Sequence, residues 1–177
     1  MNALRTGSAL MFCAALLATL ACDRAGGDDG AVRIAIGAKA PSYAAHSLAG
    51  DSVSLGGLRD KVVLLNVWAT WCHPCRTEIP ELQELHTKYA SRGLAVIGVS
   101  IDSESDEENI RQFMTEFGMT YPVWRDPGER VSARFLVLGV PTTYLIDRGG
   151  ILRWRMTGPI RPGDTTLVNA IETALAP

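Results

Sequence analysis

The sequence lacks an excess of charge of either sign. It has 17 basic and 19 acidic side chains, for a formal net charge of −2 at pH 7. Together with the absence of any basic run, this balance argues against nucleic acid as a partner and gives no sign of a basic surface patch. No repeat or low-complexity tract follows residue 32. The remaining length is that of one domain with a real core.

Cysteine and histidine are also scarce, with four and three residues in the whole chain. A structural zinc site takes four ligands, and the sequence offers one close pair of cysteines, Cys72 and Cys75, but no second pair. His46 and His86 show no metal-ligand spacing with His73. We therefore expect no metal site and no cofactor, and we interpret His46 and His86 as ordinary surface or capping residues.

The N-terminus has the pattern of an export signal. Arg5 is the only charged side chain before residues 8–21, which are almost all apolar or small. That length matches the apolar region of a signal peptide. It is shorter than a membrane-spanning helix, which needs about 20 apolar residues. The stretch ends in Ala18-Thr19-Leu20-Ala21-Cys22, which resembles the lipobox of bacterial lipoproteins, although Thr19 stands where leucine is usual. Ordinary cleavage nearby, or an uncleaved anchor, would equally mean export.

The sequence thus predicts three regions: a signal peptide of the lipoprotein type over 1–21, a flexible tether over 22–35 that begins with a lipid-bearing Cys22, and one domain over 36–177. The tether prediction comes from the Gly- and Asp-rich composition of residues 23–30. Processing would leave only Cys72 and Cys75 free to pair with each other. Outside the cytoplasm disulfides persist, so a working dithiol needs a partner that sets its redox state.

The cysteine pair follows a strand and opens a helix. Residues 62–68 are continuously apolar and predict a strand buried on both faces. Apolar residues then recur at helical spacing from Ile79 to Tyr89. Cys72 would lie at the helix N-terminus, where free N–H groups and the helix dipole stabilise a thiolate. Pro74 suits the first turn, and Cys75 is placed to attack a mixed disulfide formed on Cys72.

Other uses of the cysteine pair fit this sequence less well. A structural disulfide across two residues restrains the unfolded chain little, so stabilisation is a weak reason for it. A thiol peroxidase needs a threonine three residues before its reactive cysteine and a proline further upstream, where this chain has Ala69 and Leu65. A copper chaperone that uses Cys72, Cys75 and a histidine remains an alternative, because thiolates bind Cu(I) well.

Strands and helices alternate along the domain. The predicted elements are a hairpin around 49–51, a strand at 62–68, a helix ending near Gly93, a strand at 94–100, a helix opened by a capping box at Ser105–Glu108 and closed by Gly118, a short strand at 121–124, a helix from Asp126 to about Leu136, strands at 142–146 and 151–156 joined by a turn at 147–150, and a helix capped by Asp164. This order predicts an α/β domain whose mixed sheet has helices on both faces.

From about Ile36 to the C-terminus, the chain resembles the TlpA/ResA-like branch of the thioredoxin superfamily, the membrane-tethered thiol-disulfide oxidoreductases of bacteria. The matching residues are Asn66-Val67-Trp68-Ala69-Thr70-Trp71-Cys72-His73-Pro74-Cys75-Arg76 with Glu78 and Pro80, then Gly139-Val140-Pro141-Thr142-Thr143 and Tyr144-Leu145-Ile146-Asp147 with Gly150. The resemblance implies a thioredoxin-like fold with an N-terminal β-hairpin and a strand-helix insertion over about 101–126.

The resemblance also implies roles near the cysteines. Pro141 occupies the family's cis-proline position, facing the pair, and Val140 would present its backbone to a substrate. Glu78 is the family's acidic residue; buried and protonated it would relay a proton to or from Cys75, whereas ionised it would raise the thiol's pKa. Asn66 stands where ordinary thioredoxins keep an aspartate. The alternative for Glu78 is an exposed residue that pairs with Arg76 or Lys88.

The residues around the motif are expected to shape the site. We expect His73, between the thiols, to face solvent and to tune the reduction potential of the pair. Trp68 and Trp71 flank the site, where packing and control of access are the expected roles.

We therefore expect thiol-disulfide exchange on exported proteins: Cys72 attacks a target disulfide and Cys75 resolves the mixed disulfide, so that the target is reduced. The resemblance implies service in cytochrome c maturation or copper-site assembly, electrons from a membrane thiol-disulfide carrier, and a periplasmic or other extracytoplasmic location. A monomer is expected. The alternative direction, a disulfide donor or isomerase, uses the same residues.

Overall fold

The computed structural model describes residues 34–177. The predicted signal peptide, the lipid-bearing Cys22 and almost all of the predicted tether lie outside the described residues. None of the helices in the described part is long and apolar enough to cross a membrane.

Within residues 34–177, seven strands form one mixed sheet in the order β2-β1-β5-β4-β3-β6-β7. β3 lies near its centre, parallel to β4 and antiparallel to β6. The strands are β1 (Ala44–Ser47), β2 (Ser52–Ser54), β3 (Val62–Trp68), β4 (Leu94–Ser100), β5 (Val123–Arg125), β6 (Thr142–Ile146) and β7 (Leu152–Thr157). The expected hairpins β1–β2 and β6–β7 are both antiparallel pairs, so the mixed sheet and its two hairpins are confirmed.

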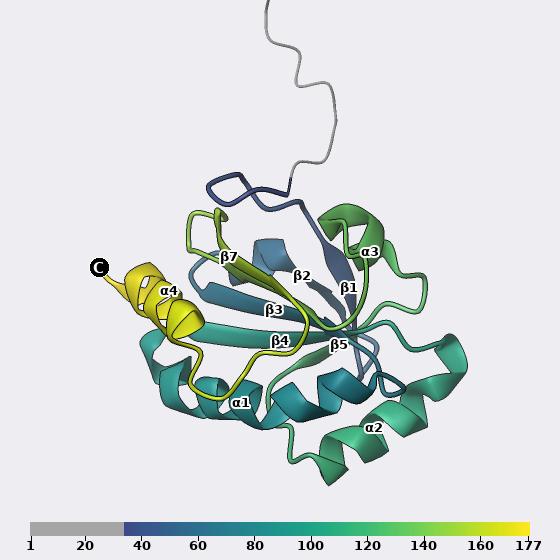
Figure 1. Cartoon of the computed structure of the whole chain (residues 1–177). Coiled ribbons are helices and arrows are strands. Elements are labelled where there is room, and N and C mark those ends of the chain that lie inside the picture. The colour runs from purple at the N-terminus through teal and green to yellow at the C-terminus, as the bar shows by residue number, and fades with distance from the viewer. Residues whose placement is uncertain (1–33) are drawn as a thin grey trace, which may run out of the picture. The chain divides into compact units, whose positions relative to one another are not determined.

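Helices cover both faces of this sheet, as the sequence predicts (Figure 1). Buried residues of α1, α2 and α4 share one apolar cluster, and those of α3 belong to the cluster on the opposite face. The helices are α1 (His73–Tyr89), α2 (Glu107–Glu116), α3 (Arg130–Phe135) and α4 (Thr165–Leu175). Together, α2 and β5 form the inserted helix and strand expected over 101–126, and β5 joins the sheet between β4 and β1.

The two clusters meet in β3, all seven residues of which are buried. Successive side chains of a strand point to opposite faces. Val62, Leu64 and Trp68 therefore enter the cluster under α1, whereas Leu65 and Val67 enter the cluster under α3. The continuously apolar run in the sequence is explained by this two-sided burial.

The start of α2 differs from the expected capping box. Asp106 rather than Ser105 precedes the helix, and no side chain bonds to the first helical amides. Instead, the hydroxyl of Ser103 donates to the Asp106 carboxylate, which also accepts from Asn109 Nδ2 at 3.0 Å. The 3₁₀ turn Glu104–Asp106 leads directly into α2, which explains why the capping geometry does not form.

α3 begins at Arg130, four residues later than predicted. Asp126 is buried, and its carboxylate accepts from the backbone N–H of Val131 at 2.6 Å and from Arg130 Nε at 3.1 Å. Glu129 has a positive φ of 49° and turns the chain into the helix. Asp126 thus bonds to the start of the helix, as expected, but it lies four residues before the first helical residue.

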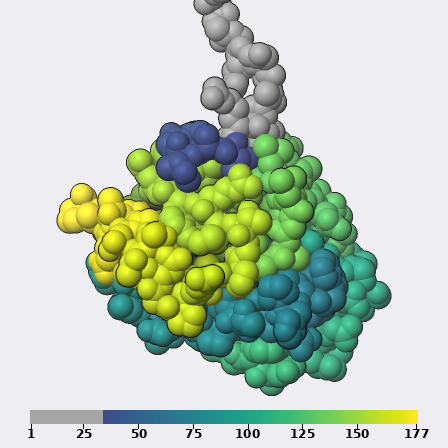
Figure 2. All heavy atoms as spheres, viewed as in Figure 1, coloured from purple at the N-terminus to yellow at the C-terminus, as the bar shows by residue number. Residues whose placement is uncertain are grey.

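The first described residues lie against the β6–β7 hairpin (Figure 2). Gly37 N–H donates to Leu152 O at 2.8 Å, and Ala40 N–H donates to Gly150 O at 2.8 Å. From the turn of the same hairpin, the Arg148 guanidinium reaches the last carbonyl groups of α4, those of residues 174–176, at 3.3 to 3.5 Å. The hairpin therefore holds both ends of the described chain.

Gly98 in β4 provides a test of the packing between β4 and β3. A Cβ at this position would lie 2.8 Å from Trp68 Nε1 and 3.3 Å from Tyr121 Cε2. Because the interior is close-packed, we expect Gly98→Ala to lower the free energy of unfolding by about 1 to 3 kcal/mol, measured by urea denaturation.

Gly128→Ala is the matched control, because nothing lies within 4 Å of a Cβ there and its φ is not positive. It should leave the stability unchanged or slightly raised. Equal stabilities for the two variants would contradict the packing described here.

Candidate active site

Cys72 and Cys75 form a disulfide at the start of α1, with an S–S distance of 2.08 Å and a Cα–Cα distance of 5.3 Å. Cys72 is the N-cap residue of α1, and the backbone N–H of Cys75 donates to Cys72 Sγ at 3.2 Å. Both cysteines are buried, Cys72 at 4% exposure and Cys75 at 0%. The sulfur of Cys72 thus lies where a helix start supplies N–H donors and a favourable dipole for an anion.

The residues around the disulfide differ in exposure. His73 and Pro74 are exposed in the first turn of α1, as expected of His73. Trp71, just before Cys72, is 66% exposed. Trp68, at the end of β3, is buried and stacks on Phe113 with ring centroids 4.9 Å apart. Trp68 therefore belongs to the core, whereas Trp71 is available to a partner.

Glu78 lies on α1, one turn beyond Cys75, and its side chain is buried between the helix and the sheet. Its Oε1 accepts from Asn66 Nδ2 at 2.7 Å, and its Oε2 accepts from the backbone N–H of Ile160 at 2.9 Å. Burial raises the pKa of Glu78 to about 7, and the two hydrogen bonds oppose part of that rise. The alternative of an exposed Glu78 is wrong, because α1 turns this side chain into the core.

Asn66 connects three elements. Its amide nitrogen donates to Glu78 on α1 at 2.7 Å and to Thr143 Oγ1 on β6 at 2.9 Å. Asn66 reaches Glu78 because the alternation along β3 points residues 62, 64, 66 and 68 toward α1. Asn66 and Glu78, singled out separately from the sequence, are thus brought into direct contact.

Asp102 is a residue that the sequence analysis missed. It follows β4 and is buried, and its carboxylate accepts from the backbone N–H of Thr70 at 3.0 and 3.1 Å and from the Thr70 hydroxyl at 2.6 Å. The Ser100 hydroxyl also donates to it at 2.7 Å. These bonds fix the loop between β3 and Cys72. The available signal in the sequence was an aspartate two residues after the end of the predicted strand at 94–100.

The Val140–Pro141 peptide bond is cis, in agreement with the expectation for Pro141. Val140 packs against the apolar cluster that contains both cysteines. Pro141 O accepts from Gly158 N–H at 2.8 Å, and the Thr142 hydroxyl donates to Gly139 O at 2.6 Å. The loop before β6 is therefore anchored at its end, while Leu138 within it is 92% exposed.

No group of three or more His, Cys, Asp or Glu side chains suited to a metal ion occurs in the described part of the chain. His46 is exposed on β1, and His86 is half-buried on α1 with its ring 6.1 Å from that of Tyr121. Neither histidine lies in the helical turn that holds the cysteines.

Comparison with known proteins places this site in a family. The profile of the AhpC/TSA family matches residues 36–155. The thioredoxin-like protein YneN of Bacillus subtilis is 38% identical over 123 residues, covering 69% of this chain and 71% of YneN. The thiol-disulfide oxidoreductase ResA of Bacillus thuringiensis is 34% identical over 118 residues, covering 67% of each chain.

A solved structure gives the same result. The structure of a Chlorobium tepidum protein described as thiol:disulfide interchange protein DsbE superposes on this chain with a TM-score of 0.74 at 32% identity. The match covers 81% of this chain and all of the Chlorobium chain. The expected thioredoxin-like fold is therefore confirmed. With its Cys72–Cys75 disulfide at the start of α1, the chain belongs to the AhpC/TSA family and is a thioredoxin-like thiol-disulfide oxidoreductase related to ResA.

Proposed function

We propose that this oxidoreductase reduces disulfides in exported proteins. The observation that carries the proposal is the position of Cys72: it caps α1 and its sulfur accepts the Cys75 N–H, while a carboxyl group is buried one turn further along. In the reduced chain, these N–H donors favour the thiolate of Cys72, which is the nucleophilic form.

The reaction is two successive exchanges. The Cys72 thiolate attacks one sulfur of the target disulfide; a Cys72–target bond forms, the target S–S bond breaks, and the other target sulfur leaves as a thiolate. Cys75 then loses its proton and attacks Cys72, which forms the internal disulfide and releases the second target thiol. The target gains two electrons and the Cys72–Cys75 pair loses them.

Glu78 is the group that we propose takes the proton of Cys75. With a pKa of about 7, its carboxyl group exchanges a proton readily near neutral pH. Asn66 and the Ile160 N–H hold the carboxylate in place through both oxygens. Asp102 acts through Thr70 as a positioning residue for the loop that carries Cys72.

The target would lie across Trp71 and the loop that ends at Pro141. The exposed indole of Trp71 offers apolar area beside Cys72, and the backbone of Val140 offers recognition that does not depend on the target's sequence. His73 and Pro74 complete the exposed turn between the cysteines. We assign these residues to site shaping and substrate binding.

The setting that we propose is extracytoplasmic. Residues 1–21 would direct export, Cys22 would carry the lipid, residues 22–35 would tether the domain of residues 36–177, and the domain would act as a monomer. Because the chain supplies no electrons of its own, a membrane thiol-disulfide carrier would reduce the Cys72–Cys75 disulfide after each cycle. The resemblance to ResA-like proteins implies that this reduction serves, for example, cytochrome c maturation or copper-site assembly.

Replacing Cys75 by alanine tests the order of attack. In cells, Cys75→Ala should accumulate mixed disulfides between Cys72 and its targets, because the resolving thiol is missing. They would appear as bands that reductant removes on non-reducing gels, with Cys72→Ala/Cys75→Ala as the control without such bands. An expressed and exported Cys75→Ala protein without adducts would count against protein targets.

The reduction potential of the pair tests the direction. We expect a value closer to about −270 mV, typical of a thioredoxin, than to about −120 mV, typical of a strong periplasmic oxidant. Equilibration with glutathione or dithiothreitol buffers measures it. A value at the oxidising end would favour the disulfide donor or isomerase, and stoichiometric copper in the purified protein would favour the copper chaperone.

Stability against pH tests the buried carboxyl group in the oxidised protein. The folded-state pKa of Glu78, about 7, lies above its ordinary 4.5, so the folded chain binds more protons between these values. The free energy of unfolding should therefore fall by about 3 kcal/mol from this group as pH rises from 4.5 to 7.

Glu78→Gln should lose this part of the pH dependence, whereas Glu84→Gln, an exposed change on the same helix, should keep it. Urea denaturation at several pH values measures both variants. An unchanged slope in Glu78→Gln would mean that the carboxyl group does not titrate in this range.

A further inference from the structure

Cationic side chains gather around a pocket at the end of the sheet opposite to the disulfide. The pocket has a volume of about 480 Å³ and lies between the segment 39–42, the 3₁₀ turn Leu55–Leu58, the start of β3 and the turn after β6. Its lining includes Lys39, Arg59, Lys61 and Arg148, which we call the cationic rim. The sequence showed no basic patch because these residues come from three separate segments.

Little opposing charge is available to the cationic rim. Asp147 is the one carboxylate among the described lining residues, and its oxygens accept from Ile151 N–H at 2.9 Å and Arg153 Nε at 2.6 Å. Asp60 is exposed between Arg59 and Lys61 in the sequence.

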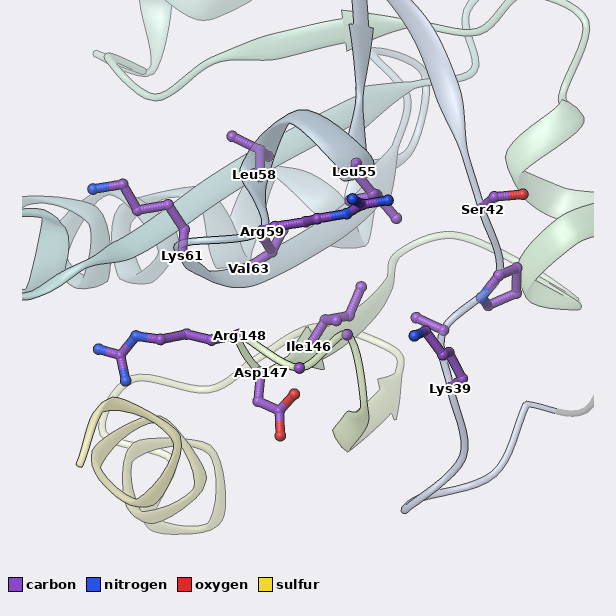
Figure 3. Close-up of a pocket in the computed structure, with 15 residues that line it drawn as sticks. Lys39, Ser42, Leu55, Leu58, Arg59, Lys61, Val63, Ile146, Asp147 and Arg148 are labelled. Atoms are coloured by element: carbon purple, nitrogen blue, oxygen red, sulfur yellow. The ribbon is translucent and has the colours of Figure 1, made fainter. Parts of the chain in front are cut away.

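Over residues 34–177, no ion pair involves Lys39, Arg59 or Lys61. Figure 3 shows Arg59 reaching across the pocket and Lys39 pointing toward it from the other wall, while Lys61 and Arg148 extend away from Lys39. Lys39, Arg59 and Lys61 are thus free to bind an external anion, whereas Arg148 is already bonded to the end of α4.

Apolar groups accompany these cations. Val63 and Ile146 are buried residues of the pocket lining, and Leu55 and Leu58 are half-buried members of the same lining. Ile36, three residues before Lys39, is 60% exposed. Membrane surfaces bind segments that combine apolar side chains with Lys and Arg.

In the described part of the chain, this face holds the residues that follow the proposed tether in sequence. The described chain begins here, since Gly37 and Ala40 pair with the β6–β7 hairpin. From Lys61, β3 runs about 20 Å away from the pocket before the chain reaches Cys72. The 17 residues from Cys22 to Lys39 span at most about 60 Å.

We propose that the cationic rim docks the domain on anionic phospholipid headgroups, with headgroup phosphates bound at Lys39, Arg59 and Lys61. This inference rests on the extracytoplasmic, anchored setting proposed above. Each cation near an anionic membrane surface raises binding roughly 5-fold. Docking through this face would turn the opposite end of β3, with the disulfide, away from the bilayer.

The test is hydrogen exchange of the full processed chain reconstituted in vesicles. One set is phosphatidylcholine alone, and the other is phosphatidylcholine and phosphatidylglycerol in equal parts. We expect exchange in residues 37–42, 55–61 and 146–151 to be at least about 5-fold slower in the anionic vesicles. Arg59→Gln/Lys61→Gln should abolish that difference, and the charge-matched control Lys88→Gln/Arg134→Gln, on α1 and α3, should keep it.

Equal exchange in both sets of vesicles would overturn the proposal, and so would loss of the difference in the control variant as well. The same protection by soluble glycerol phosphate in phosphatidylcholine vesicles would also overturn it, because it would indicate a site for free phosphate. Disulfide reduction in solution, measured for the same variants, should be unchanged. The reduction assay shows whether the proposed reductase activity is present, and the mass of the N-terminal peptide shows whether Cys22 carries the lipid. Failure of either one can therefore be told apart from failure of docking.

Discussion

The burial of β3 on both faces is the constraint on which the rest of this structure depends. With no solvent-facing side, the strand needs partners along both edges and apolar cover above and below, which β4, β6, α1 and α3 provide. The strand's carboxyl end then lies at a fixed place under the start of α1. The position of Cys72 is therefore set by the core itself, and the Asp102 carboxylate secures the intervening loop at Thr70.

The same strand sets the chemistry around the disulfide. An apolar side chain at Asn66 would leave the buried carboxylate of Glu78 with one fewer donor and would raise its pKa further, because the hydrogen bond from Asn66 favours the ionised form. The Ile160 N–H stabilises the same form from the loop before α4. The proton affinity of the site is thus a balance between burial and two hydrogen bonds, each supplied by a different part of the fold.

Much of this was predictable from local patterns. The strand at 62–68 and the helix after it follow from apolar spacing, and the strand at 94–100 was predicted to the residue. The contacts of Asp102 with Thr70, and of Ile160 with Glu78, join residues far apart in sequence, so no local pattern indicates them. The cationic rim was missed for the same reason. The predicted capping box was wrong because a 3₁₀ turn leads into α2, and the residue composition does not indicate that turn.

Trp71 has a consequence for how this protein can be studied. Trp68 and Trp124 are buried and Trp154 is half-buried, whereas the indole beside Cys72 is two-thirds exposed. A water-soluble quencher would therefore act mainly on the fluorescence of this one indole, and a target bound over the disulfide would shield it. The chain thus carries its own optical reporter of substrate engagement, at the residue next to the nucleophile, without an attached dye.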